Sequence, residues 1–571
     1  MKNREIAAIF NSIADILEIK DANVFRIRAY RRAAASLDSL PYDLDKLVED
    51  DRLTEIVGVG KDLSDKIKEY YKDGEIGYLS DLLDEVPKEL LLMLKIPGLG
   101  PKKVKLFYKE LGIISIAQLE DAAQEGRLRE LPSIKKKTEE NIIKGIEFLK
   151  RGSGRMLLGW TLPLAESIIF ELKKLKEVKK ISIAGSLRRM QDTIGDIDIL
   201  VGSSKPQKIM DRFSELDIVN KVILKGKTKT SILTENDIQV DLRVVEESSF
   251  GAALQYFTGS KNHNIHLRQI AQRKGLKINE YGIFRVKDNK KIASKNEEDI
   301  YKRLGMSFIA PELREDRGEI ERALDGSLPE LINERDIKGD LHIHSDFSDG
   351  SISLEDVIED CYKRGYKYMA ITDHSKSLGI AHGLSRERLL EQIKKIKKIE
   401  KRYKDFKILT GTEMDIKADG SLDWDRDILE RLDVVIAAVH TGFRQPKEKM
   451  TKRILLAIES GLVNIIAHPS GRLIGEREPY EVDWDIIFQA AAKYKVALEI
   501  NSHIMRLDLT DINVLRAKES GVLIAINTDT HSKEHLDMLK YGVSVARRGW
   551  LSKQDVVNCF SYNKLLKFLK R

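Results

Sequence analysis

The spacing of hydrophobic and polar positions changes along the chain. Residues 1 to about 150 show the spacing of short amphipathic helices, interrupted by glycine pairs. From about residue 178 the segments KKISIAG, IGDIDILVG and NDIQVDLRVV alternate or run apolar, which is typical of strands. Helical spacing returns at about 249–275, and the charged segment PELREDRGEIERALDGSLPELINERD then reads as a connector with a short helix.

The pattern changes again at about residue 337, from which short apolar segments typical of strands alternate with longer helical stretches. Seven strands are predicted to end near HIH (342–344), TDH (372–374), GTE (411–413), VH (439–440), AHP (467–469), EIN (499–501) and NTDTH (527–531). This alternation predicts parallel βα units, and seven strands favour closure into a barrel over an open sheet. Polar residues stand where each strand ends.

Length and composition indicate a multidomain globular protein. The 571 residues exceed what one hydrophobic core supports, and 42% apolar with 33% charged residues does not resemble a disordered chain. We expect a cytoplasmic protein, because no long apolar run or signal peptide is present, and the two cysteines, Cys361 and Cys559, suit a reducing compartment. The net charge of +7 is by itself weak support for nucleic-acid binding.

Two glycine pairs in the N-terminal part carry the helix-hairpin-helix pattern. Gly58 and Gly60 lie in VGVGKDLSDKI, and Gly98 and Gly100, followed by Lys102, lie in IPGLGPKKVKLFYKEL. Such glycines allow a tight turn, and the amides of the following helix start can hold a DNA phosphate. One copy could be an ordinary helix end, whereas two copies, together with the basic segment RIRAYRRAA, favour DNA binding.

Paired carboxylates lie in the segment AGSLRRMQDTIGDIDILVG (184–202). Alternate side chains of a strand share one face, so Asp196 and Asp198 should point the same way, and Asp241 in QVDLRVV can join them from a neighbouring strand. Three converged carboxylates suit two Mg²⁺ or Mn²⁺ ions for phosphoryl transfer, although a D-x-D alone is common on solvated strands.

The residues around the carboxylates suit a nucleoside triphosphate. Gly185 and Ser186 form a turn whose backbone could approach phosphates, Arg188 can neutralise their charge, and Gly195 precedes the paired aspartates. The combined pattern of G-S-x-R-R, G-D-x-D and a further aspartate is much more specific than any of its parts. It predicts nucleotidyl transfer.

From about residue 5 to 318 the sequence resembles the polymerase beta-like nucleotidyltransferases of DNA polymerase family X. The resemblance includes YFTGSKNHNIHLR (256–268). It implies that Tyr256, Phe257 and Gly259 belong to the turn that contacts the nucleotide sugar and excludes ribose. It also places Asn264 at the base of the incoming nucleotide and Arg268 at the template strand. From the residues alone, Tyr256 and Phe257 would be read as helix-end packing.

The chain departs from the family pattern at Met190, where glycine is common, and at Gln239, where arginine often stands. The resemblance further implies 5′-deoxyribose-phosphate lyase activity, with Lys66 as the Schiff-base nucleophile and Tyr30 and Arg26 holding a 5′-phosphate. Asp62 replaces a basic residue of that phosphate pocket, which should weaken binding of a dianion. A surface lysine on a helix is usually only solvated, so this activity stays open.

Histidines gather in the C-terminal part: all eleven lie at or beyond His263, and nine lie at or beyond His342. Nine residues at the predicted strand ends form a candidate metal site: His342, His344, Asp349, His374, Glu413, His440, His468, Asp529 and His531. At the mouth of a barrel they would meet, and imidazole with carboxylate suits up to three Mn²⁺, Zn²⁺ or Fe ions. The spacing resembles the polymerase and histidinol phosphatase (PHP) domain over about 337–571.

Together these patterns predict six segments: a helical DNA-binding, lyase-like domain (1–85), a helix-hairpin-helix fingers-type subdomain (86–150), a nucleotidyltransferase palm (151–245), a thumb-type subdomain (246–318), a linker (319–336) and a PHP domain (337–571). The whole resembles bacterial and archaeal family X polymerases with a PHP domain. That implies gap filling in base excision repair on primed DNA with a 5′-phosphate, a 3′-5′ exonuclease, abasic-site cleavage as an additional activity, and a monomeric protein. The alternatives are a small-molecule phosphatase with a DNA-tethering arm and a non-catalytic DNA-binding scaffold.

Overall fold

The computed structural model describes residues 2–40, 44–87, 89–94, 96, 99–132, 134–135, 138–139, 142–143, 146, 155–235 and 237–570. The chain divides into two compact units. One consists of Met1–Arg155, Leu216–Leu224 and Ser231–Val240, and the other of Met156–Glu215, Lys225–Thr230 and Asp241–Arg571. Among the described residues, no helix has the length and apolar character needed to cross a membrane.

The N-terminal part is helical, as the sequence predicts. Its helices are α1 (Lys2–Ile19), α2 (Val24–Ser39), α3 (Asp45–Glu49), α4 (Lys61–Asp73), α5 (Gly77–Glu85), α6 (Glu89–Met93), α7 (Pro101–Leu111) and α8 (Ile116–Gln124). Their apolar faces enclose one core that includes Phe10, Ile13 and Phe107, all fully buried. Short helices of this kind are stable because they share such a core.

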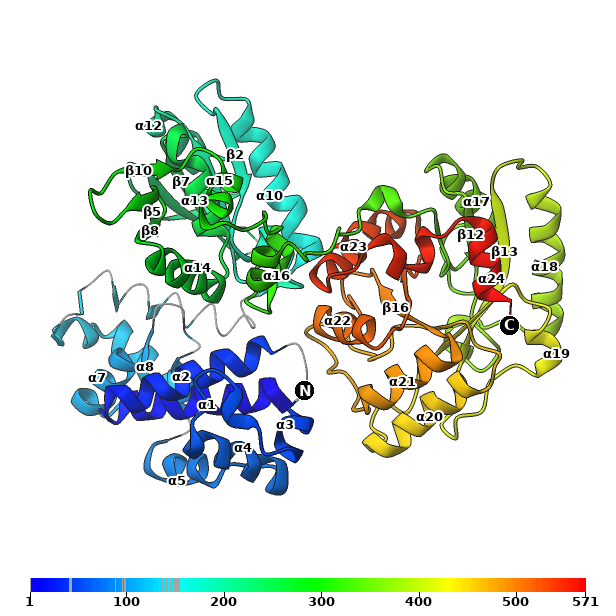
Figure 1. The fold of residues 1–571 in the computed structure, drawn as a ribbon, viewed down its shortest axis with the longest axis horizontal. Helices are drawn as coiled ribbons and strands as arrows, with labels where there is room; N and C mark the ends of the chain where they lie inside the picture. Colours follow the sequence, from blue (N-terminus) through cyan, green and yellow to red (C-terminus); the bar gives the residue numbers. More distant parts are fainter. Residues whose placement is uncertain are drawn as a thin grey trace. The chain divides into compact units, whose positions relative to one another are not determined.

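The predicted strands after residue 178 form a five-stranded sheet in the order β2-β4-β7-β6-β5 (Figure 1). The strands of this region are β1 (Met156–Leu157), β2 (Lys180–Ile183), β3 (Thr193–Ile194), β4 (Asp196–Gly202), β5 (Val219–Lys225), β6 (Lys229–Thr234) and β7 (Gln239–Val245). Its helices are α10 (Leu158–Lys173), α11 (Gly185–Arg188), α12 (Pro206–Ser214) and α13 (Phe250–Thr258). β4 lies between β2 and the central strand β7, and its pairing beside β7 decides which carboxylates meet.

The predicted helical stretch 249–275 is two helices, α13 and α14 (Lys261–Arg273), divided at Gly259 and Ser260. The Ser260 side chain caps α14 by accepting a hydrogen bond from the backbone of His263 at 3.3 Å. There follow β8 (Leu276–Asn279), β9 (Gly282–Arg285), β10 (Lys291–Ala293), α15 (Glu297–Leu304) and α16 (Glu319–Asp325). Ile320 and Ala323 of α16 are buried in the core of this region, although the charged sequence around them reads as a connector.

The C-terminal part contains the seven parallel strands that the sequence predicts (Figure 1). In chain order they are β11 (Gly339–Asp340), β12 (Tyr368–Ile371), β13 (Lys407–Asp415), β14 (Val434–Ala438), β15 (Ile465–Ile466), β16 (Ala497–Asn501) and β17 (Ile524–Asn527). A parallel bridge between Ile343 and Thr530 joins the first and last strands just past their ends. The expectation of a barrel is therefore confirmed.

Helices cover the outside of this barrel: α17 (Leu354–Lys363), α18 (Arg386–Glu400), α19 (Arg426–Leu429), α20 (Lys447–Glu459), α21 (Trp484–Tyr494), α22 (Asp511–Glu519), α23 (Leu539–Arg548) and α24 (Tyr562–Leu569). The strands are buried on both faces, which explains why they read as apolar runs. Parallel strands end at the same rim of a barrel, so the polar residues that follow them are brought together there.

Candidate active sites

Three aspartates gather on adjacent strands of the five-stranded sheet. Asp196 and Asp198 lie on β4, and Asp241 lies on the neighbouring β7. Burial raises the pKa of Asp198 to about 7, and the charges of Asp196 and Asp241 add to this effect. From the neighbouring strand β6, the Nζ of Lys229 forms an ion pair with Asp241 Oδ2 at 2.5 Å. The sequence predicted the convergence of the carboxylates but not this lysine.

Gly185 makes room for the half-buried Asp198. It adopts a positive φ of 62°, and a Cβ at this position would lie 2.3 Å from Asp198 Oδ2. A side chain here would meet both a backbone conformation that disfavours it and the carboxylate itself. Ser186 follows, half-buried, in α11, and the half-buried Gly195 precedes Asp196.

Arg188, predicted to face phosphates, is engaged within the protein. Its guanidinium donates to Glu297 at 2.8 and 2.7 Å and to Thr258 Oγ1 at 2.7 Å. The Glu297 side chain is only 5% exposed, and Arg314 also binds it, at 2.5 Å. The structure therefore ties α11 to the end of α13 and to α15, and sequence reasoning missed Glu297.

The residues predicted to contact the nucleotide and template gather at the junction of α13 and α14. The rings of Tyr256 and Phe257 meet edge to face with centroids 5.2 Å apart, and Gly259 follows them. Asn264 is buried and donates from Nδ2 to the carbonyl of Tyr256 at 2.7 Å. Arg268 is exposed and donates from Nε to the carbonyl of Asn264 at 3.1 Å.

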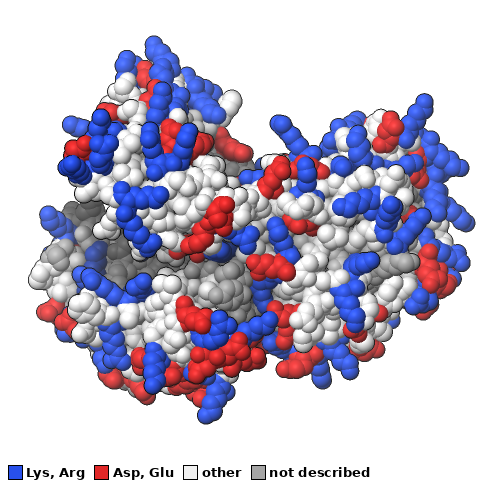
Figure 2. Space-filling model, viewed as in Figure 1, with Lys and Arg blue, Asp and Glu red and all other residues white. Residues whose placement is uncertain are grey.

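The two predicted hairpins share one backbone geometry. Val59 donates to the Ile56 carbonyl and Leu99 to the Ile96 carbonyl, each at 3.0 Å. Gly60 and Gly100 then stand immediately before α4 and α7, with open space where a Cβ would project. Gly58 has a φ of 89°, Lys102 is exposed, and Gly98 lies outside the described residues. On the face shown in Figure 2, basic and acidic side chains are interspersed.

The three residues predicted for the lyase site surround one tyrosine, Tyr78, which the sequence did not single out. Arg26 lies 4.8 Å and Lys66 5.3 Å from the centre of its ring, and the ring of Tyr30 stacks on it at 6.4 Å. Tyr30 is only 1% exposed, and Lys66 Nζ is paired with Asp62 at 2.7 Å. The residues are brought together, but the amine that lyase chemistry needs is held in an ion pair.

The nine predicted metal ligands meet at the rim of the barrel. Three overlapping groups have ligand atoms within 4.8 Å of one another: His342, His344, Glu413 and Asp529; His344, Asp349, His374 and His531; and His374, Glu413 and His440. The ninth residue, His468, places Nε2 3.0 Å from Glu413 Oε1. His342 Nε2 and His344 Nε2 are 3.1 Å apart, so these two rings project together as predicted.

Further polar residues orient these ligands. Glu499 lies 2.7 Å from His342 Nδ1 and also accepts the backbone N–H of His468, while Asp415 lies 2.7 Å from His440 Nδ1. Such partners fix the ring orientation and leave the other nitrogen for an ion. Sequence reasoning missed both, although strand alternation from Glu413 to Asp415 and the position of Glu499 in the EIN strand could have indicated them.

The imidazoles and carboxylates of the rim shift one another's pKa values. Burial opposes the charge of Glu413, but His440, His342 and His374 hold its pKa well below its usual value. Burial likewise opposes the charge of His440 and His531, yet neighbouring carboxylates raise the pKa of each to about 9. Burial, with His531 and His374 nearby, lowers the pKa of His344 to about 3. Protonated His440 and His531 therefore balance the negative charge of the neighbouring carboxylates.

The donor set fits divalent metal ions. Among the described residues, Nδ1 of His344 and Nδ1 of His468 are buried without a hydrogen bond, which is costly unless another partner is supplied. Nitrogen and oxygen donors without thiolate suit Zn²⁺, Mn²⁺ or Fe²⁺. Ions held there would lower the pKa of a water molecule and neutralise charge on phosphate oxygens.

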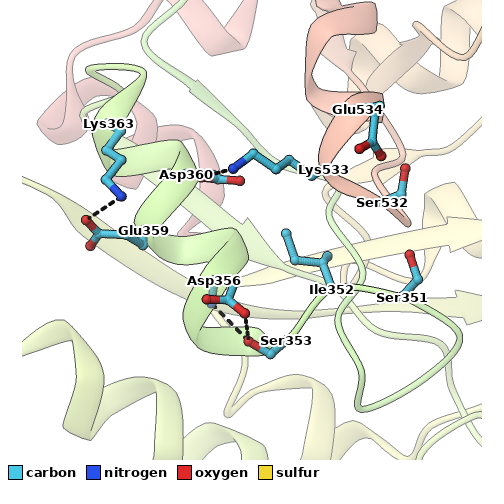
Figure 3. A pocket seen from close by; sticks show the side chains of 10 residues that line it. All are labelled: Ser351, Ile352, Ser353, Asp356, Glu359, Asp360, Lys363, Ser532, Lys533 and Glu534. Atoms are coloured by element: carbon cyan, nitrogen blue, oxygen red, sulfur yellow. Dashed lines mark hydrogen bonds and ion pairs between the residues drawn. The ribbon is translucent and has the colours of Figure 1, made fainter.

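A polar hollow of about 490 Å³ lies beside α17 and the segment 532–534 (Figure 3). The segments after Asp349 and His531 both line it, and they are joined by a hydrogen bond from Ser351 N to His531 O at 2.7 Å. Its charged side chains pair with one another, as Lys533 does with Asp360 at 3.0 Å. None of the nine predicted metal ligands lines this hollow.

The chain is similar to known proteins along its whole length. Family models match the DNA polymerase beta thumb at residues 253–315, the PHP domain at 340–503, a helix-hairpin-helix domain at 1–76 and a SAM-like helix-hairpin-helix tandem at 90–147. The "DNA polymerase/3'-5' exonuclease PolX" of Bacillus subtilis (strain 168) is 40% identical over 573 residues, which cover the full length of both chains. The chain belongs to the family X DNA polymerases that carry a PHP domain. Membership confirms the predicted resemblance and implies the use of divalent metals.

Other relatives match a smaller share of this chain. A probable phosphatase of Thermoanaerobacter sp. (strain X514) is 28% identical over 243 residues, or 40% of this chain and 94% of that protein. The probable phosphatase YcdX of Escherichia coli O81 (strain ED1a) is 31% identical over 208 residues, or 34% of this chain and 78% of that protein. Both matches are too short to include the polymerase part and the barrel together.

Proposed function

We propose that this protein fills short gaps in DNA during base excision repair and trims 3′ ends with a separate active site. The observation that carries the proposal is the presence of two candidate metal sites in one chain. One is formed by Asp196, Asp198 and Asp241 on the sheet, and the other by the imidazole and carboxylate cluster on the barrel. The full-length similarity to a polymerase with 3′-5′ exonuclease in its name supports the pairing.

For nucleotidyl transfer, the three aspartates would hold Mg²⁺ or Mn²⁺, which align the triphosphate and neutralise developing charge. Gly185, Ser186 and Gly195 would line the phosphate side, with Arg188 beside them, while Tyr256, Phe257, Gly259 and Asn264 would select the sugar and base. Their clustering around α11 and the α13–α14 junction supports these roles. Arg268, exposed on α14, would contact the template.

For hydrolysis, the nine barrel residues would hold up to three ions, with Mn²⁺, Zn²⁺ or Fe as candidates. Three overlapping ligand groups support this number. Glu499 and Asp415 would keep His342 and His440 in the orientation that presents one nitrogen to an ion. The buried rim would limit bulk water around the reacting phosphate. Abasic-site cleavage by the same centre stays a prediction.

The substrates would be deoxynucleoside triphosphates and gapped or primed DNA with a 5′-phosphate, bound by a monomer. Gly58, Gly60, Gly98, Gly100 and Lys102 would hold the DNA backbone. Lyase chemistry at Lys66, with Tyr30 and Arg26, requires release of the Asp62 ion pair. We propose the domain boundaries 1–85, 86–150, 151–245, 246–318, 319–336 and 337–571. Within the proposed linker 319–336, α16 packs into the core of the preceding region.

Primer extension and degradation on gapped DNA, with Mg²⁺ and Mn²⁺ compared, tests the proposal. The wild type should extend the primer when nucleotides are present and shorten a 5′-labelled primer stepwise when they are absent. A chelator should abolish both activities, and Mn²⁺ should restore the exonuclease best, since it accepts mixed nitrogen and oxygen ligands.

A small-molecule phosphatase is the second candidate, because relatives that match 40% of this chain or less are described as probable phosphatases. Release of inorganic phosphate from small esters, without any shortening of DNA, would favour it. The three aspartates on the adjacent strands β4 and β7 argue against it, since a DNA tether needs no converged carboxylates.

A further inference from the structure

Arg548 of α23 is a buried arginine that reaches from the barrel region to the nucleotide-binding segment. Its Nη1 donates to the backbone carbonyl of Arg189 at 2.8 Å and to Glu315 Oε1 at 3.1 Å. Its Nη2 donates to Asp511 Oδ2, at the start of α22, at 2.5 Å. The Arg548 side chain is only 4% exposed, so its guanidinium forms these hydrogen bonds away from bulk water, where charge-assisted hydrogen bonds are strong.

The residues that Arg548 binds hold both nucleotide motifs. Glu315 Oε1 also accepts from Arg189 Nε at 2.9 Å and from Gln191 Nε2 at 2.6 Å. Arg189 Nη1 in turn donates to the carbonyl of Thr258, in the Tyr256–Ser260 turn, at 2.5 Å. One buried network therefore links the segment around Gly185, the sugar-side turn and the barrel's helices.

A second polar link lies nearby. Arg472, four residues after His468, donates to Asp192 at 3.1 Å, and it also binds the carbonyls of Arg506 and Leu507 on the barrel rim. Asp192 stands between the Gly185 segment and the paired aspartates. Residues of the barrel region therefore bind the polymerase segment at two positions, Arg189 and Asp192.

Apolar packing is continuous across the same junction. Leu515 of α22 and Trp550, just after α23, are buried in one core with Ala252 and Leu267 of α13 and α14. At Gly159, near the start of α10, a Cβ would lie 2.1 Å from Ile504 Cγ2. The barrel is therefore packed too closely against the polymerase part to be an independent appendage.

We infer that the PHP domain completes the polymerase site, with Arg548 as a positioning residue for the nucleotide-binding segment. The inference rests on the proposed polymerase function. A binding site needs its groups held to about half an ångström, and the partners of Arg189 supply that restraint from outside the palm. If Arg548 is removed, Glu315 and Asp511 lose a buried cation, and the segment that Glu315 holds should shift.

The test is single-turnover incorporation by the full-length protein on gapped DNA, with the nucleotide titrated. Arg548→Met should raise the half-saturating concentration of deoxynucleotide by at least about tenfold, since small misplacements near a reacting group have large effects. It should also reduce discrimination against ribonucleotides, because the network reaches the Tyr256–Ser260 turn. Exonuclease rate and metal content at the barrel should stay unchanged, and Arg548→Lys should recover part of the loss.

Arg547→Met is the matched control, because Arg547 is the neighbouring residue on α23 and binds Glu312 and the Ile332 carbonyl, away from Arg189. Equal effects of the two variants, or unchanged nucleotide dependence in Arg548→Met, would overturn the inference. If Arg548→Met does not fold, Glu315→Gln, which keeps size and one acceptor, decides in its place by the same criteria. Failure of the wild type to incorporate nucleotides would refute the proposed function instead.

Discussion

The contact between Gly185 and Asp198 leads to a sharp prediction for the polymerase site. In Gly185→Ala the new methyl group would start 2.3 Å from Asp198 Oδ2, whereas ordinary contact begins at 3.4 Å. The carboxylate or the α11 segment must therefore move by about 1 Å. Displacement of a reacting group by about 1 Å can cost about a hundredfold in rate, or about 3 kcal/mol of activation free energy.

The same substitution also places alanine at a positive φ, which costs roughly 1–2 kcal/mol of stability. Gly275→Ala separates the two effects, because Gly275 has a similar φ of 68° but open space around a Cβ. Single-turnover primer extension should show the hundredfold loss in Gly185→Ala and near wild-type rates in Gly275→Ala. Similar rates in both variants would refute the reasoning.

Two further predictions concern metal and DNA binding. Burial raises the pKa of Asp198 to about 7, so protons compete with metal ions for this carboxylate. The half-saturating Mg²⁺ concentration for incorporation should therefore rise as pH falls below about 7 and level off above it. A flat profile between pH 6 and 8 would contradict this. A Cβ at Gly100 would lie in open space, so Gly100→Val should leave the melting temperature nearly unchanged while weakening binding to DNA of any sequence and lowering the salt dependence. Unchanged affinity in a filter or anisotropy assay would mean that this loop is only structural.

Much of the fold and of both sites follows from local pattern. The seven strand ends, and the meeting of His342, His344 and Glu413 there, follow from βα alternation and from the rule that parallel strands end at one rim. Likewise, strand alternation predicts that Asp196 and Asp198 share a face. Such inferences need only neighbours in sequence and a general rule of topology.

Partners distant in sequence escape this reasoning. Glu297 binds Arg188 across 109 residues, and Arg548 binds the Arg189 carbonyl across 359, without any periodic signal in the chain. The apolar face of α16 is hidden in a charged segment, and Lys229 reaches Asp241 from β6. Lys229 thereby supplies a cation beside the third aspartate, although Gln239 replaces the arginine that is frequent in the family.

The central claim is that one chain carries two separate metal-dependent active sites, and reciprocal variants on one gapped, 5′-labelled substrate test it most directly. Asp196→Ala should lose incorporation by several orders of magnitude while its exonuclease remains, because this carboxylate lies only in the sheet site. His342→Ala with His344→Ala should lose an ion and the stepwise shortening of the primer while extension continues. The account predicts this double dissociation, and loss of both activities in both proteins, with folding intact, would contradict it.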